Sequence, residues 1–217
     1  MKFPVFTSFI LFVLFTQFIL RRSNRREQEA DATFWDRERE ANAARKKPLD
    51  DLPFLHIPLE ELPFGVLPED PDIMTQEKTI RSLAATEDEE WSRIVNLTGI
   101  SNTELKLRYG AANLERLIYY DQNYTSLVTA LQAWGAALSE HGLYHEAETV
   151  WSYAISIGTD ISGTYAGLIQ LWRDHLFLPE ETARERIAAL RPTAESLQSL
   201  SRERILQLID TSSTTTE

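Results

Sequence analysis

The chain has 217 residues, 43% of them hydrophobic and 25% charged, which is the mixture of a folded globular protein. Its net charge of -11 repels nucleic-acid phosphates, so we expect no nucleic-acid partner. The absence of cysteine excludes disulfides, thiolate catalysis and cysteine-ligated zinc. Eight glycines are too few for the frequent turns of an all-β protein, which favours an all-α fold.

Residues 1–20 are predicted to be a transmembrane anchor, because residues 3–20 form an uncharged and mostly apolar stretch. A helix of about 20 residues crosses a hydrocarbon core of about 30 Å. A cleaved signal peptide is the alternative, but no small-residue cleavage site follows the apolar run. Arginines follow it instead, at Arg21, Arg22, Arg25 and Arg26. Since positive residues stay on the cytoplasmic side, the expectation is a single-pass protein of the cell membrane with a cytoplasmic C-terminal domain.

Residues 21–47 mix both charge signs with good helix formers, which predicts a charged helix beside the membrane. Phe34 and Trp35 are its one pair of large apolar residues. Three roles remain open for this pair: packing on the domain, contact with lipid headgroups, or contact with a partner.

Residues 48–71 contain six prolines, and this density excludes a long helix. The segment is nevertheless too apolar for a solvated linker. We therefore predict an extended strap that lies along the helical domain and buries its apolar side chains. A docking strip for a partner is the alternative.

Residues 72–210 are predicted to form the all-α domain, with residues 211–217 as a disordered tail. The first helix carries Ile73, Ile80 and Leu83. A capping box at residues 86–89 predicts a second helix, which carries Trp91, Ile94 and Val95 and ends at Gly99.

Another capping box at residues 101–104 predicts a helix that ends near residues 121–123. The next helix carries Leu127, Leu131, Trp134 and Leu138 and stops at Gly142. These two helices are expected to form a hairpin.

Small and aromatic residues recur at regular offsets from residue 131 onward. Small residues allow two helices to approach closely, and aromatic residues fill the groove between hairpins. In this pattern residues 131–158 resemble a tetratricopeptide repeat, with matching positions at Gly135, Gly142, Tyr144, Ala147, Trp151 and Ala154. The resemblance implies an array of helical hairpins that binds another protein.

A second, partial copy begins at Ser162. Tyr165, Leu168 and Trp172 follow Leu131, Trp134 and Leu138 at the 34-residue period of this repeat. Its second helix is predicted to open at Pro179 and to carry Ile187 and Leu190. The order of span, charged helix, proline segment and repeat resembles membrane-anchored proteins of this repeat type in Gram-positive anaerobic bacteria, which implies a bacterial cytoplasmic membrane.

Residues with reactive side chains do not form a catalytic pattern. His141 and His145 flank a glycine turn, a geometry that does not place two zinc ligands on one helical face. His56 and His175 are isolated in the sequence. Acidic runs at residues 60–61, 87–90 and 180–181 are interpreted as helix starts. We therefore predict no catalytic residue, no cofactor and no metal site, and no enzyme activity.

The sequence predicts a membrane-anchored adaptor that binds an unidentified protein through its repeat surface. The alternative is a structural element of the membrane surface that acts through the basic segment beside the anchor.

Overall fold

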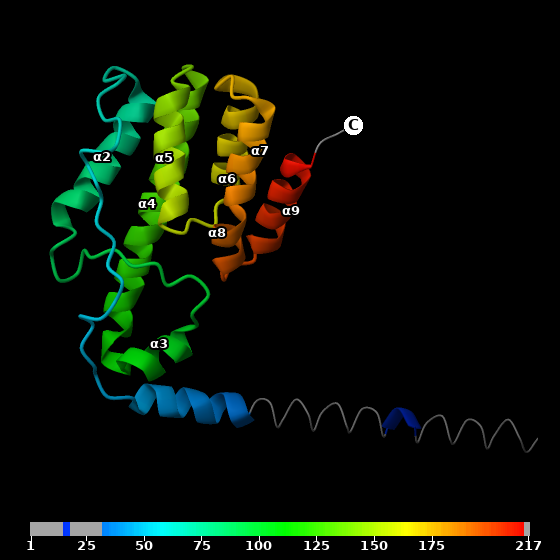
Figure 1. The fold of residues 1–217 in the computed structure, drawn as a ribbon. Helices are drawn as coiled ribbons and strands as arrows, with labels where there is room; N and C mark the ends of the chain where they lie inside the picture. Colours follow the sequence, from blue (N-terminus) through cyan, green and yellow to red (C-terminus); the bar gives the residue numbers. More distant parts are fainter. Residues whose placement is uncertain (1–14, 18–31, 215–217) are drawn as a thin grey trace, which may run out of the picture. The chain divides into compact units, whose positions relative to one another are not determined.

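The computed structural model describes residues 15–17 and 32–214 (Figure 1). Every regular element in these residues is a helix, which confirms the all-α prediction. The predicted anchor lies outside the described residues, apart from residues 15–17. Among the described helices, none combines the length and the hydropathy of a membrane span.

The chain divides into two compact units. Unit 1 comprises Met1–Pro48 and Ser101–Leu114, and unit 2 comprises Leu49–Ile100 and Glu115–Glu217. The segment Ser101–Leu114 therefore groups with the N-terminal part of the chain, although the sequence places it inside one domain of residues 72–210.

Unit 1 pairs a helix at residues 32–43 with helix α3, Asn102–Tyr109. Glu38 joins them, because it pairs with Lys106 and accepts a hydrogen bond of 2.7 Å from Thr103 Oγ1. These hydrogen bonds hold the pKa of the Glu38 carboxyl below its usual value. Ser101 caps α3 as predicted, since its side chain accepts from Glu104 N.

A tight turn closes unit 1 between α3 and the short 3-10 helix η1, Ala111–Asn113. Gly110 has a φ of 93°, and a Cβ atom there would lie 2.6 Å from the backbone of Lys46. Glycine is needed at this position, because both the dihedral and the contact exclude a side chain. The buried amide of Asn113 donates to the carbonyls of Lys47 and Tyr109, both at 2.7 Å.

Unit 2 is a layer of helices that lie side by side in Figure 1. In chain order the helices are α2 Pro71–Thr86, α4 Leu114–Glu140, α5 Tyr144–Ser156, α6 Ser162–Gln170, the π-helical turn η2 Leu171–His175, α7 Glu180–Ala189, α8 Arg191–Ser196 and α9 Arg202–Ser213. Helix α4 begins with the last residue of unit 1. Helix α9 continues through Ser213, so the prediction of a disordered tail at residues 211–217 is wrong for residues 211–213.

One continuous hydrophobic core runs through unit 2 and includes residues from all of its long helices. Trp134 and Leu138 of α4 are fully buried, as are Ala147 and Ala154 of α5. Helix α6 begins at Ser162, and Pro179 precedes α7, at the positions the sequence predicts. Ile187 of α7 is also fully buried.

The proline-rich segment before α2 contributes to the same core. Ile57 and Leu62 are buried in it, and Phe64 packs on Trp134 with ring centroids 4.8 Å apart. The backbone is also held, since Leu55 N donates to Ile94 O at 2.9 Å and Ile57 N donates to Glu87 Oε2 at 3.1 Å. Several apolar side chains of this segment thus pack in the core of unit 2, whereas Leu59 and Val66 are exposed.

The prediction that one helix ends near residues 121–123 is wrong, because α4 runs unbroken through them. Asp121 and Asn123 resemble a stop signal but bind the neighbouring loop: Asp121 Oδ1 accepts from Leu97 N at 3.1 Å, and Asn123 Nδ2 donates to Arg93 O at 3.2 Å. The predicted upstream hairpin is therefore absent from the described residues, because its second helix is part of α4.

The predicted helix after residue 86 is also wrong. Residues 87–100 form turns and extended backbone without a helix. Thr86 belongs to the last turn of α2, where its hydroxyl donates to Ser82 O at 3.2 Å. The carboxylate of Glu87 binds Ile57 N and His56, so it does not serve a helix start.

Candidate interaction surface

A close helix crossing surrounds the indole of Trp151 on α5. A Cβ atom at Gly135 of α4 would lie 2.6 Å from Cδ1 of this ring, and one at Gly167 of α6 would lie 2.6 Å from Cζ3. The indole Nε1 donates to Gln132 O at 3.3 Å. Since real Cβ atoms do not approach so closely, both positions require glycine for the three helices to pack.

Of the six predicted repeat positions, four lie in the packed interface of α4 and α5, and two lie at the turn between these helices. Gly135 and Trp151 are in contact, and Ala147 and Ala154 are buried on α5 beside them. Gly142 lies in the α4–α5 turn with a φ of 76°, and Tyr144 begins α5, where it stacks on His175 at 4.5 Å. Sequence reasoning missed Gly167, although a glycine inside a helical pattern is a signal of close packing.

Glu148 on α5 binds side chains of both η2 and α7. Its Oε1 accepts from Trp172 Nε1 at 2.6 Å and from Arg186 of α7 at 2.7 Å. His145 lies 3.9 Å from Oε2. One carboxylate thus connects α5, η2 and α7.

We expect Glu148→Ala to lower the free energy of unfolding by about 1–3 kcal/mol, because the Trp172 N–H loses its acceptor in a partly buried place. Glu148→Gln keeps an acceptor oxygen and loses only the ion pair to a half-exposed Arg186, so its cost should stay below about 1 kcal/mol. Urea unfolding followed by circular dichroism measures both values. Equal losses in the two variants would contradict the assigned role of the Trp172 hydrogen bond.

The chain departs from regular geometry directly after α6. Leu176 N donates to Leu171 O at 2.9 Å, which closes the wider turn of a π-helix at η2. Next to it, Phe177 has a φ of 50° and is 95% exposed. Among the described residues it is the one non-glycine residue with a positive φ. Such π-turns and strained residues are frequent at functional sites.

A cavity of about 260 Å³ lies beside this loop. Residues from η2, α7 and the end of α9 line it: Arg173, Asp174, Leu178, Glu180, Ala183, Arg184, Ile187, Ser212 and Thr214. A second, more open groove of about 380 Å³ runs between α6 and α9, and Ser212 lines both. Its wall is mostly small or apolar, with Gly163, Ala166 and Leu208, and Arg204 stands at its side.

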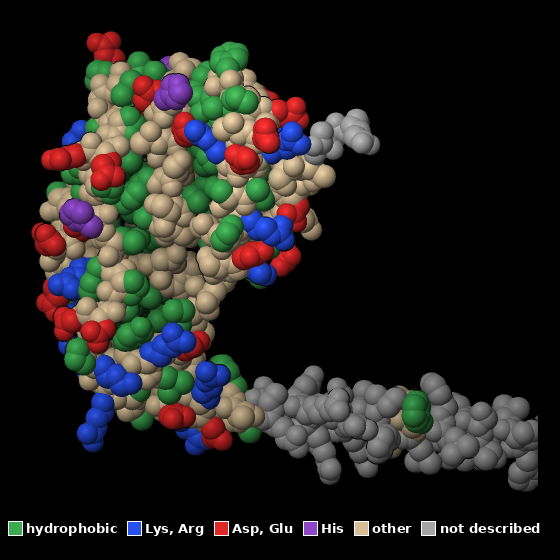
Figure 2. All heavy atoms as spheres, viewed as in Figure 1, with side chains coloured by type: hydrophobic (Ala, Val, Ile, Leu, Met, Phe, Trp, Pro, Cys, Tyr) green, Lys and Arg blue, Asp and Glu red, His purple; other side chains and the backbone are tan. Residues whose placement is uncertain are grey.

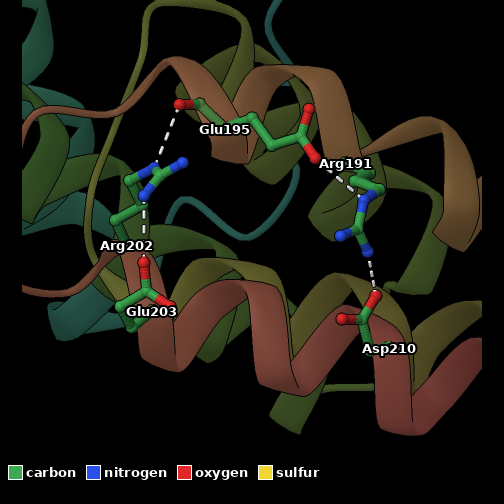
Figure 3. A network of polar contacts seen from close by, with 5 residues as sticks. All are labelled: Arg191, Glu195, Arg202, Glu203 and Asp210. Atoms are coloured by element: carbon green, nitrogen blue, oxygen red, sulfur yellow. Dashed lines mark hydrogen bonds and ion pairs between the residues drawn. The ribbon is translucent and has the colours of Figure 1, made fainter.

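A network of ion pairs and hydrogen bonds connects α8 with α9 (Figure 3). Arg191 binds both Glu195 and Asp210, and Arg202 donates to Glu195 O at 3.0 Å and pairs with Glu203. Each pair is exposed and contributes little by itself. Together they orient α9 beside α8, and Figure 2 shows both charge signs intermingled on the side of the molecule where α7 and α9 lie.

The histidines take up different contacts. His141 donates from Nδ1 to Ala137 O at 2.9 Å and directs Nε2 toward Asp70 at 3.3 Å, whereas His56 pairs with Glu87. The acidic run at residues 180–181 lies in the first turn of α7, but those at 60–61 and 87–90 begin no helix. In the described part of the chain, no group of three or more metal-ligating side chains gathers.

Comparison with known proteins gives no match to a family model, to a curated protein or to a solved structure.

Proposed function

We propose that the chain is a membrane-anchored adaptor of the tetratricopeptide-repeat type, without catalytic activity, which binds another protein. Residues 3–20 would anchor it in the cell membrane, with the helical domain in the cytoplasm. The binding surface is centred on Phe177 and the adjoining cavity. The single observation that carries this proposal is Phe177, whose backbone has a positive φ and whose side chain is almost fully exposed.

The position of Phe177 is unfavourable for the isolated chain in two respects. A left-handed backbone costs a residue with a Cβ atom roughly 1–2 kcal/mol, and the exposed ring adds no burial of its own. Aromatic side chains supply much of the binding free energy at protein interfaces, where they insert into a pocket of the partner. Burial of this ring by a partner would offset the free-energy cost of the left-handed backbone and of the exposed side chain.

The surroundings of Phe177 support the same proposal. Arg173, Asp174 and Glu180 offer both charge signs at the rim of the cavity, and the nearby α6–α9 groove offers apolar walls. An apolar anchor surrounded by polar groups is the usual composition of a protein interface. A reactive group is not required for this role.

We expect Phe177→Gly to abolish partner binding while leaving stability unchanged or raising it by about 1 kcal/mol, since glycine relieves the backbone strain. Phe177→Leu should retain part of the binding. The measurement replaces Phe177 with a photo-cross-linking phenylalanine derivative in the cell that makes the protein, and identifies the adducts by mass spectrometry.

Leu200 offers a matched control, because it is also fully exposed but lies in the α8–α9 loop. The same cross-linker at Leu200 should not give the discrete adduct expected at Phe177. Identical adducts at both positions, or a Phe177→Gly variant that still cross-links its partner from a neighbouring position, would overturn the proposed surface.

A further inference from the structure

The charges of the chain are separated between the two units. Unit 1 contains 12 Lys and Arg residues against 7 Asp and Glu residues, a net charge of +5. Unit 2 contains 10 against 26, a net charge of -16. An acidic protein thus carries a basic unit, and that unit includes the predicted anchor.

After the ion pairs of unit 1 are counted, positive charge remains in excess among its described residues. Three of its four described carboxylates are neutralised by a neighbouring cation: Asp36 by Arg39, Glu38 by Lys106 and Glu104 by Arg108. Four exposed cations have no carboxylate partner among the described residues, namely Arg37, Arg45, Lys46 and Lys47. Figure 2 shows several Lys and Arg side chains, in blue, on the surface of this unit.

An aromatic pair is exposed near the start of the described helix at residues 32–43. Phe34 is 54% and Trp35 60% exposed, and their rings meet edge to face at 5.3 Å. Phe34 lies on the helix face of Glu38 and Ala41, the face that packs on α3, but one turn beyond that contact. The packing face of this helix therefore extends past the contact with α3 to the exposed ring of Phe34.

We propose that unit 1 binds an anionic lipid surface, with Phe34 and Trp35 in the headgroup layer and the cations of residues 45–47 against the lipid phosphates. The aromatic pair lies near the start of the described helix at residues 32–43, and the cations directly follow its C-terminal end, roughly 15 Å away along its axis. A helix in the membrane plane therefore brings both of its ends to the interface. Aromatic rings prefer this layer, and basic residues are attracted to its negative charge.

The test uses the full chain in lipid vesicles and its lack of cysteine. An Ala32→Cys variant carries one fluorescent label beside the aromatic pair, and a Gln170→Cys variant carries it on exposed α6 as the matched control. Vesicles contain phosphatidylcholine alone or with 30% phosphatidylglycerol, and doxyl-labelled lipids quench a label that enters the interface. Flotation first establishes that the chain is attached to the vesicles.

We expect quenching at position 32 to be at least about twofold greater in the anionic vesicles, and the label at position 170 to stay unquenched in both. Reversal of Arg45, Lys46 and Lys47 to glutamate should remove the difference, and Phe34→Ser with Trp35→Ser should reduce quenching in both lipids. Equal quenching in the two lipids, or a difference that survives charge reversal, would overturn the proposal. If the label at position 32 is shielded from a water-soluble quencher in native membranes but not in vesicles, the surface binds a protein and the lipid proposal is wrong.

The outcome is separable from that of the proposed adaptor function. A chain that floats with vesicles but shows no anionic preference refutes only the lipid surface and leaves partner binding at Phe177 untouched. A chain that does not float contradicts the membrane anchor and the lipid surface together.

Discussion

Replacing Gly167 with alanine is expected to destabilise the folded protein by about 3 kcal/mol or more, and Gly135→Ala by a similar amount. Each new Cβ atom would overlap the Trp151 indole, which is itself held by Gln132 O and cannot move aside. The helix propensity of alanine offsets about 1 kcal/mol of this cost. The net loss is a large part of the stability of an ordinary domain.

Gly163→Ala is the matched control, because Gly163 lies one turn earlier on α6 and a Cβ atom there would meet no atom closer than 3.1 Å, the distance to Gln132 Nε2. This variant should be close to the wild type in stability. Urea unfolding of the three variants, repeated in a Trp151→Leu background, forms double-mutant cycles. If Gly167→Ala lowers the free energy of unfolding by the same amount with leucine at position 151, the contact between Gly167 and Trp151 is not the cause of the loss.

Raising the pH above 10 should destabilise the protein through its buried tyrosines. Burial raises the pKa of Tyr165 to about 12 and that of Tyr153 to about 12, and it also raises the pKa of Tyr124. The unfolded chain releases these protons near pH 10, so between pH 10 and 12 the unfolded state binds fewer protons than the folded state. Stability is therefore complete below pH 10 and declines as pH rises toward 12.

The fully buried Tyr165 alone should account for roughly 2–3 kcal/mol of this loss at pH 12, and the half-buried Tyr153 for less. The hydroxyl of Tyr165 donates to Thr159 O at 3.3 Å, so Tyr165→Phe should lose about 1 kcal/mol at pH 7. The variant should then show a shallower decline between pH 10 and 12 than the wild type. Parallel declines, measured by urea unfolding at each pH, would show that Tyr165 titrates as an exposed phenol.

The helical class and several boundaries could be predicted because their signals are local. Ser101 has a cap geometry that needs only its own neighbours, and Pro179 cannot lie inside α7. Gly142 ends α4 through its positive φ. The alternation of small and aromatic residues likewise predicted a close helix crossing in this region, and the structure places Gly135 against Trp151 there.

The errors concern polar residues whose partners are distant in sequence. Asp121, Asn123 and Glu87 have the side chains of caps and turns, but each binds backbone groups at least 24 residues away. With those hydrogen bonds supplied by another segment, α4 continues and residues 87–100 stay irregular. A single sequence does not distinguish a local acceptor from a distant one, because the same oxygen serves both.

Local propensity and periodicity in the sequence predict the helical class, the turn at Gly142 and most of the buried helix faces. They do not predict the turn at Gly110, which lies inside a predicted helix, or the exposure of Trp91. Three features appear only in the folded structure: Gly167 touches Trp151, residues 101–114 group with the N-terminal helix, and Phe177 is exposed and has a positive φ. Each of these features results from packing between residues that are far apart in the chain. A local sequence pattern does not contain that information.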